Sequence, residues 1–132
     1  MARKIVASSR YQVPVRGFTQ AVEAPAGGRL LFVSGLTARR ADGTIVGEGD
    51  IHAQTRQVYE NLRLILAEVG GTLDDVVRTT TYLRRMEDQA AMHEVKLEVF
   101  GAHPPASTTV QIVRLYDERQ LIEVEATAVV SS

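Results

Sequence analysis

Three hydroxyl side chains follow one another in the segment Ala106-Ser107-Thr108-Thr109, which carries no charge. A pocket lined by them would offer a ligand neutral hydrogen bonds, because these hydroxyls both donate and accept. A serine nucleophile needs an adjacent base, and the sequence shows none for Ser107 or Thr109. The segment therefore favours ligand binding over covalent catalysis. Strand hydroxyls that satisfy the local backbone are the alternative.

Histidine is the side chain that titrates closest to neutral pH, and the chain has three. His93 falls in a segment of helical periodicity and could act as an acid or a hydrogen-bond donor. A solvated histidine on a helix surface is the alternative. His52 and His103 have no metal-ligand spacing to each other, and the sequence contains no cysteine. We therefore expect no metal site.

Composition and charge narrow the class of protein. The 132 residues suit a single domain, residues 1–132, with its own core, and the net charge of −1 is spread without a basic run. This balance argues against a nucleic-acid partner. The N-terminal MARKIVASSR is too poor in apolar residues for a signal peptide, and no apolar span has membrane-crossing length. We expect a cytoplasmic protein with no membrane partner.

Strands and helices interleave along the chain and must position these groups. Apolar and β-branched runs predict strands at 4–7, 18–24, 29–36, 76–83, 108–115 and 121–130. The strands at 18–24 and 29–36 are predicted to pair as an antiparallel hairpin across the APAGG turn. One helix is predicted between its cap Asp50 and the stop at Gly70-Gly71, and a second from Asp88 to Phe100.

Apolar spacing gives each predicted helix one buried side. In the first helix these residues are Val58, Leu62, Ile65, Leu66 and Val69, and in the second they are Ala91, Met92, Val95 and Val99. Two helices are too few to cover both faces of a sheet. One face is therefore expected to lack a helical cover.

The last strand shows what that uncovered face carries. Alternation places Ile122, Val124, Ala126 and Ala128 under the helices, and Leu121, Glu123, Glu125, Thr127 and Val129 on the other side. Leucine and valine beside two carboxylates suit an interface between subunits, with the carboxylates near clefts at its edge. The alternative is a partly solvated face on which both glutamates pair with cross-strand arginines.

Five segments resemble the RidA/YjgF family in their order: FTQAVEA, LLFVSGL, VYENLRLILAEVGGTLDDVVRTTTYL, PPAST and IEVEATAV. The resemblance covers residues 18–130. It implies an α+β, chorismate-mutase-like fold, a mixed sheet with two helices on one face, and a homotrimer with a central barrel. It also implies small-molecule ligands in clefts between subunits, where active members hydrolyse enamines and imines such as 2-aminoacrylate without any cofactor.

The same resemblance assigns site residues by position. These are an aromatic residue, a Ser-Gly pair, a polar residue on the second helix, an arginine, a residue two positions beyond it and a glutamate, which correspond here to Phe18, Ser34, Gly35, His93, Ser107, Thr109 and Glu123. Two of them depart from the family: Ser107 replaces the arginine, and Phe18 lacks the usual tyrosine hydroxyl. Arg16, beside Phe18, is a speculative replacement for the lost cation, and an exposed loop arginine is the alternative.

The missing arginine bears directly on substrate choice. A guanidinium binds a carboxylate through two parallel hydrogen bonds, which a serine cannot imitate. A hydrogen bond to a charged group contributes roughly 1.5–3 kcal/mol, so we expect about tenfold to a hundredfold weaker binding of small imino acids. Efficient 2-aminoacrylate deamination is therefore not expected.

Three functions follow from these residues, in order of preference. In the first, the protein hydrolyses an imine, an enamine or a related metabolite, and Glu123 orients the water as a general acid and base. An interface salt bridge is the alternative role for Glu123, and trimer contacts are expected for Glu125. In the second, the protein is a non-catalytic binding or accessory protein that kept the cleft. Ribonuclease activity is the least supported, because no basic stripe is present.

Overall fold

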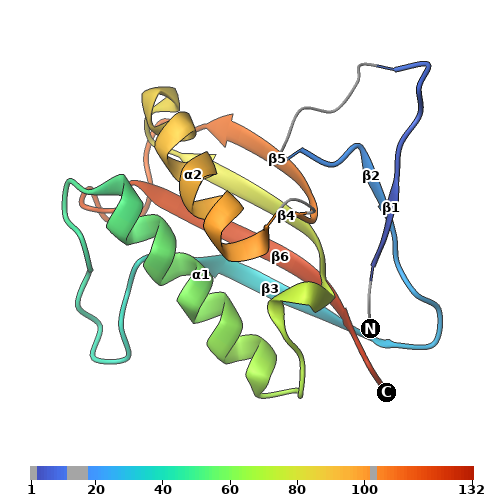
Figure 1. Cartoon of the computed structure of the whole chain (residues 1–132). Helices are drawn as coiled ribbons and strands as arrows, with labels where there is room; N and C mark the ends of the chain where they lie inside the picture. Colours follow the sequence, from blue (N-terminus) through green and yellow to red (C-terminus); the bar gives the residue numbers. More distant parts are fainter. Residues whose placement is uncertain (1–2, 12–17, 102–103) are drawn as a thin grey trace.

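The computed structural model describes residues 3–11, 18–101 and 104–132. Its elements, in chain order, are β1 (Lys4–Val6), β2 (Ala21–Glu23), β3 (Arg29–Leu36), α1 (Ile51–Ala67), η1 (Leu73–Asp75), β4 (Val76–Leu83), η2 (Met86–Asp88), α2 (Gln89–Phe100), β5 (Ala106–Gln111) and β6 (Ile122–Val130). The main sheet has the order β3-β6-β4-β5, and β1 and β2 form a separate two-stranded sheet (Figure 1). Only β4 and β5 are parallel in the main sheet. The predicted mixed sheet and α+β class are thus confirmed.

Both long helices lie across the same face of the main sheet (Figure 1). The side of β6 beneath them carries the four predicted residues Ile122, Val124, Ala126 and Ala128, and all are buried. They join two apolar clusters: one with Val58, Tyr59, Leu83, Met92 and Val95, the other with Val33, Leu62, Leu66 and Val76. Burial of this apolar surface between helices and sheet is the main stabilising contribution.

Helix α1 begins where its cap was predicted. The Asp50 side chain accepts a hydrogen bond from the Ala53 backbone N–H. The helix ends at Ala67, before the predicted glycine stop, and Gly70 completes the turn at a φ of +76°. Ile65 was predicted to be buried, and this is wrong: it is 36% exposed, because Leu62 and Leu66 already fill the side that meets the sheet.

The predicted hairpin between residues 18–24 and 29–36 is also wrong. The shorter strand β2 pairs with β1, whereas β3 pairs with β6. The eight residues of β3 form more cross-strand pairs with β6, which has nine residues, than they could with β2, which has three. Pairing with β6 sets Val33 opposite Ala126 on the helix-covered side of the sheet.

The opposite face of the main sheet is exposed in the single chain. Leu30 and Phe32 of β3 are 64% and 74% exposed there. On β6, Glu125 accepts a short hydrogen bond from the Tyr82 hydroxyl of β4, not from an arginine. The hydrogen bond to Glu125 is the main cause that raises the pKa of Tyr82. Val129, which alternation places on this face, is buried.

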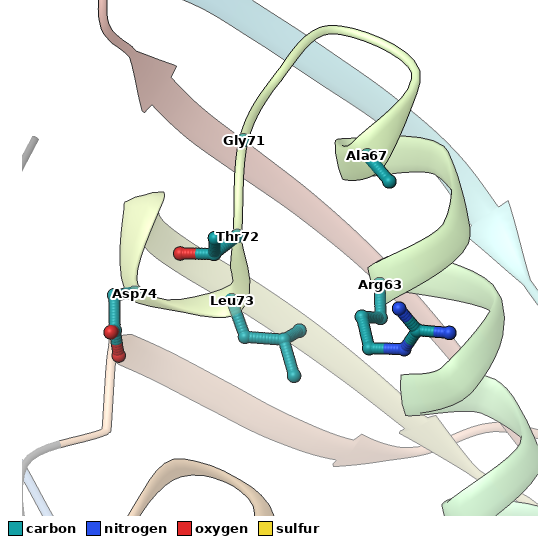
Figure 2. Close-up of a pocket in the computed structure, with 6 residues that line it drawn as sticks. All are labelled: Arg63, Ala67, Gly71, Thr72, Leu73 and Asp74. Carbon is teal, nitrogen blue, oxygen red and sulfur yellow. The ribbon is translucent and has the colours of Figure 1, made fainter.

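A cavity of about 440 Å³ lies between the end of α1 and η1 (Figure 2). Arg63 and Leu73 are on its two sides, and Gly71 and Thr72 close one end. The Arg63 guanidinium is already paired with Glu60, at 2.6 Å between Nη2 and Oε1. None of the side chains predicted to form a functional site lines this cavity.

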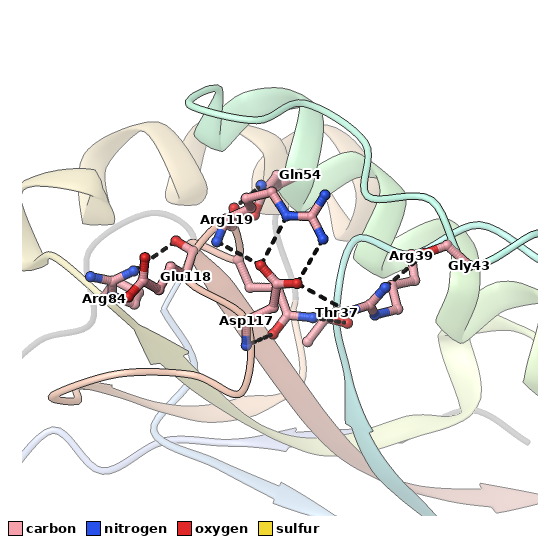
Figure 3. Close-up of polar contacts among 9 residues, drawn as sticks. Thr37, Arg39, Gly43, Gln54, Arg84, Asp117, Glu118 and Arg119 are labelled. Carbon is pink, nitrogen blue, oxygen red and sulfur yellow. Dashed lines mark hydrogen bonds and ion pairs between the residues drawn. The ribbon is translucent and has the colours of Figure 1, made fainter.

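The connection between β5 and β6 is tied to α1 and to the segment after β3 (Figure 3). Arg119 binds the Asp117 carboxylate through Nε at 3.0 Å and Nη2 at 2.7 Å, and these hydrogen bonds hold the pKa of Asp117 far below its usual range. Buried Gln54 of α1 donates to the Arg119 carbonyl and accepts from the Leu121 N–H. These contacts fix the point at which β6 begins. In the described part of the chain, no helix has both the length and the apolarity needed to cross a bilayer.

Candidate functional site

Phe18, His93, Lys96 and Ser107 come together beside α2, and we call them the α2 group. The Phe18 ring stacks on the His93 ring, with centroids 4.7 Å apart and an interplanar angle of 14°. The Lys96 Nζ lies 5.5 Å from the Phe18 centroid and donates a hydrogen bond to the Ser107 Oγ at 2.8 Å. The structure thus joins three predicted site residues and adds a lysine.

Three different elements position the α2 group. His93 and Lys96 are one helical turn apart on α2, so their side chains share one side of it. Ser107 lies on β5, paired in register with Thr79 of β4. Thr19 donates from its hydroxyl to the Pro104 carbonyl at 2.7 Å, and this bond holds the chain next to Phe18 against the turn before β5. Thr109 lies two residues beyond Ser107 on β5.

Gly35 of β3 lies against Glu123 of β6, and we call these two residues together with the neighbouring Ser34 the β6 group. A Cβ atom at Gly35 would lie 2.6 Å from the Glu123 Oε2, far closer than atoms can approach. Glycine at this position therefore leaves the space that the Glu123 carboxylate occupies. Ser34 is exposed on the same edge strand, β3.

The two groups lie on opposite faces of the main sheet. Ser107 is in register with Thr79, whose side chain faces the helices and is buried. Glu123 is in register with Tyr82. Tyr82 has the opposite side-chain direction from Thr79, because directions alternate along a strand. Within one chain, the predicted site residues are therefore not brought together into one pocket.

Lys96 is the member of the α2 group that the sequence prediction missed. It is only 4% exposed, and burial lowers the pKa of its ammonium. The usable signal was a lone lysine three residues after His93, within the apolar side formed by Met92, Val95 and Val99. Lysine on a helix is ordinarily solvated, so its position in that stripe pointed to a buried charge.

The remaining histidines and arginines have other placements. The His93 Nδ1 is buried and has no hydrogen-bond partner among the described residues. His52 is paired with Glu94 across the two helices, at 3.0 Å. Arg16 and His103 lie outside the described residues. The proposed replacement of the lost cation by Arg16 therefore stays a prediction.

The fold and the two residue groups define a protein class: an α+β domain with a half-covered mixed sheet and polar groups on each side of it. The family model described as Endoribonuclease L-PSP matches residues 10–130. A RutC family protein from Pyrococcus abyssi is 37% identical over 97% of this chain and 98% of its own length. The 3-aminoacrylate deaminase RutC from Acinetobacter baylyi is 32% identical over 97% of this chain and 98% of its own.

Solved structures agree with these sequence relatives. The crystal structure of YyfB from Yersinia pestis, described as a Rid family protein of unknown function, superposes with a TM-score of 0.87. It is 36% identical and covers 98% of this chain and all of its own. The chain belongs to the RidA/YjgF family, as its sequence resemblance predicted.

Proposed function

We propose that this protein hydrolyses an imine or enamine in clefts between the copies of a cytoplasmic homotrimer. The observation that carries the proposal is the Glu123 carboxylate, which lies over Gly35 on the sheet face opposite the α2 group. A site that uses both groups is complete only where the Glu123 of one copy meets the α2 group of another. Exposed Leu30 and Phe32 supply apolar surface for that contact. The relative named as a deaminase supports the chemistry.

The proposed reaction requires one water and one carboxylate. Glu123 accepts a proton as the water oxygen bonds to the carbon of the C=N group. Glu123 passes this proton to the nitrogen, which gives an intermediate with a hydroxyl and an amino group on the same carbon. Glu123 then transfers the hydroxyl proton to the nitrogen as the C=O bond forms and the C–N bond breaks, so that ammonia and a carbonyl compound leave. Substrate and water supply all the atoms. A polar wall of Ser34, Ser107 and Thr109 would orient the substrate by neutral hydrogen bonds.

Exchange of Glu123 for glutamine tests this role directly. Glutamine keeps the size but cannot accept the proton, so we expect at least about a hundredfold slower ammonia release from imines generated in the assay. Glu125→Gln is the matched control, because Glu125 lies two residues away on the same face and bonds to Tyr82. Its rate should stay near that of the wild type. The proposal fails if the wild type and Glu123→Gln both show only the uncatalysed rate.

A second candidate is a binding protein that kept the cleft without the chemistry. It is favoured by Phe18, which has no hydroxyl, and by Ser107, which cannot form a two-pronged contact to a carboxylate. Keto acids, amides and aromatic carboxylates should then raise the unfolding temperature. A screen in which no ligand does so would exclude this candidate.

A further inference from the structure

The ammonium of Lys96 is a buried charge with few partners. Its residue is 4% exposed, and the Ser107 Oγ is its only hydrogen-bond partner among the described residues. An ammonium carries three N–H donors. Within the described ranges, no carboxylate lies close enough to pair with it. Buried charges are ordinarily paired, so this one is incompletely compensated.

A second unsatisfied group lies one helical turn away. The His93 Nδ1 is buried and lacks a partner among the described residues. The Phe18 ring is in contact with the His93 ring and lies near the Lys96 ammonium, so it connects the two. Of the two, the Lys96 ammonium is the group that lies next to the Ser107 hydroxyl. A ligand with an anionic oxygen would compensate its charge.

We propose that Lys96 binds the carboxylate of a small 2-keto or 2-imino acid. The proposal rests on the proposed function for the C=N end of the substrate, and it names the charge that recognises the other end. Ser107 then positions the ammonium through the 2.8 Å hydrogen bond. The positive charge that position 107 lacks comes from α2 instead. Since an ammonium is a point charge, it fixes the orientation of the carboxylate less strictly than a guanidinium fork.

Pyruvate is the probe for this site, and lysine chemistry makes the test specific. The chain has only two lysines, Lys4 and Lys96. Protein labelled with [ε-13C]lysine should therefore give two lysine signals, and pyruvate should shift the signal of Lys96 alone. Variants Lys4→Met and Lys96→Met assign the signals. No shift of the Lys96 signal at saturating pyruvate, or no binding at all, would overturn the proposal.

Pyruvate affinities measured by calorimetry distinguish a role of the Lys96 charge in binding from a purely structural role of its side chain. Lys96→Met should weaken pyruvate binding by about tenfold or more, while Lys4→Met should leave it unchanged. Lys96→Gln can still donate to Ser107 but carries no charge, so it should bind as weakly as Lys96→Met. If Lys96→Gln binds like the wild type, Lys96 has only a structural role. The variant Lys96→Gln also keeps the proposal testable if Lys96→Met does not fold.

A neutral ligand completes the design. The wild type should prefer pyruvate over pyruvamide by about tenfold, and Lys96→Met should lose that preference. An equal preference in both proteins contradicts the proposal. Failure of the proposed function gives a different result, since imine hydrolysis would be absent while pyruvate still shifted the Lys96 signal.

Discussion

Burial of the charged Lys96 side chain lowers the free energy of unfolding. Burial lowers the pKa of this ammonium below the ordinary 10.5, so the unfolded chain holds the proton to higher pH than the folded protein does. The free energy of unfolding therefore rises with pH between the folded and the unfolded pKa, as the buried amine loses its proton. At pH values below the pKa of Lys96 in the folded protein, the cost of burying its charge no longer changes with pH.

The variant Lys96→Met removes this penalty. We expect its unfolding midpoint in urea to be no lower than that of the wild type at pH 7.5, because methionine fills the same space without a charge. The difference between the two proteins should shrink as the pH rises toward 10.5. Measurements at equal protein concentration between these pH values test this. A constant difference would show that burial does not perturb the amine.

Gly35→Ala is a second prediction at the level of single residues. The added methyl would lie 2.6 Å from the Glu123 Oε2, so the carboxylate must move. We expect imine hydrolysis to fall by about tenfold to a hundredfold, with little change in thermal unfolding, since a small displacement of a reacting group is that costly. The double variant with Glu123→Gln should be no slower than Glu123→Gln alone. Additive losses would show that Gly35 acts independently of Glu123.

The candidate site could be approached from the sequence for residues assigned by position in the resemblance, but not for a residue defined by its surroundings. His93 and Ser107 could be assigned from their place in the resemblance, and both lie in the α2 group. Lys96 was not singled out, although it lies in the apolar stripe of α2, because the sequence does not show which side chains a distant segment will cover. The contact with Phe18 depends on how residues far apart in the sequence pack.

Single side chains link the secondary-structure elements, and Gln54 is the clearest example. Its fully buried amide bonds to two backbone groups at the start of β6. Gln54→Ala leaves both backbone groups without partners, so we expect a loss of about 2 kcal/mol in the free energy of unfolding. Gln57→Ala, on the same helix with one bond to Asn61, is the control and should lose much less. Equal losses would contradict the assigned role.

Exposed ion pairs between the helices contribute less. Arg56 pairs with Glu98 at 3.2 Å, and His52 pairs with Glu94, but these side chains are all largely solvated. Pairs of this kind contribute about 0–1 kcal/mol. The register of α1 against α2 is therefore set mainly by the apolar cluster that includes Val58, Met92 and Val95.

The sequence was sufficient to predict which segments form the long strands, but not which strands pair with each other. The dense run at 29–36 and the β-branched run at 76–83 are both strands, as predicted. The hairpin prediction failed because adjacency in sequence was taken as the guide to pairing. The apolar side of β3 is instead matched by β6, and that match depends on contacts almost one hundred residues apart.

For the whole molecule, the two residue groups on opposite faces predict complementation between inactive subunits. If the chain forms the proposed homotrimer, about one quarter of the sites in trimers mixed from equal amounts of Glu123→Gln and Lys96→Met chains would combine an intact Glu123 with an intact Lys96. Imine hydrolysis should therefore recover to about a quarter of the wild-type rate after the two variants are unfolded and refolded together. Chains that carry both substitutions provide the control and should show no recovery.

The exposed apolar face gives a second prediction at this scale. Phe32→Glu places a charge on a residue that is 74% exposed in the single chain. If this face is buried between copies, the charge should dissociate the trimer and abolish hydrolysis while the far-ultraviolet circular dichroism stays unchanged. Sedimentation velocity measures the assembly. A wild type that sediments as a monomer, or an unaltered trimer in the variant, would contradict the arrangement.

The position of β6 has a consequence for how this chain is made. The strand latest in sequence lies between β3 and β4, which do not pair with each other. Until residues 122–130 leave the ribosome, the nascent chain cannot close its central sheet, and the apolar sides of β3 and both helices have no partner strand. Folding of this sheet must therefore wait until β6 has been synthesised, and a chain cut before residue 122 should be treated as unfolded by chaperones and proteases.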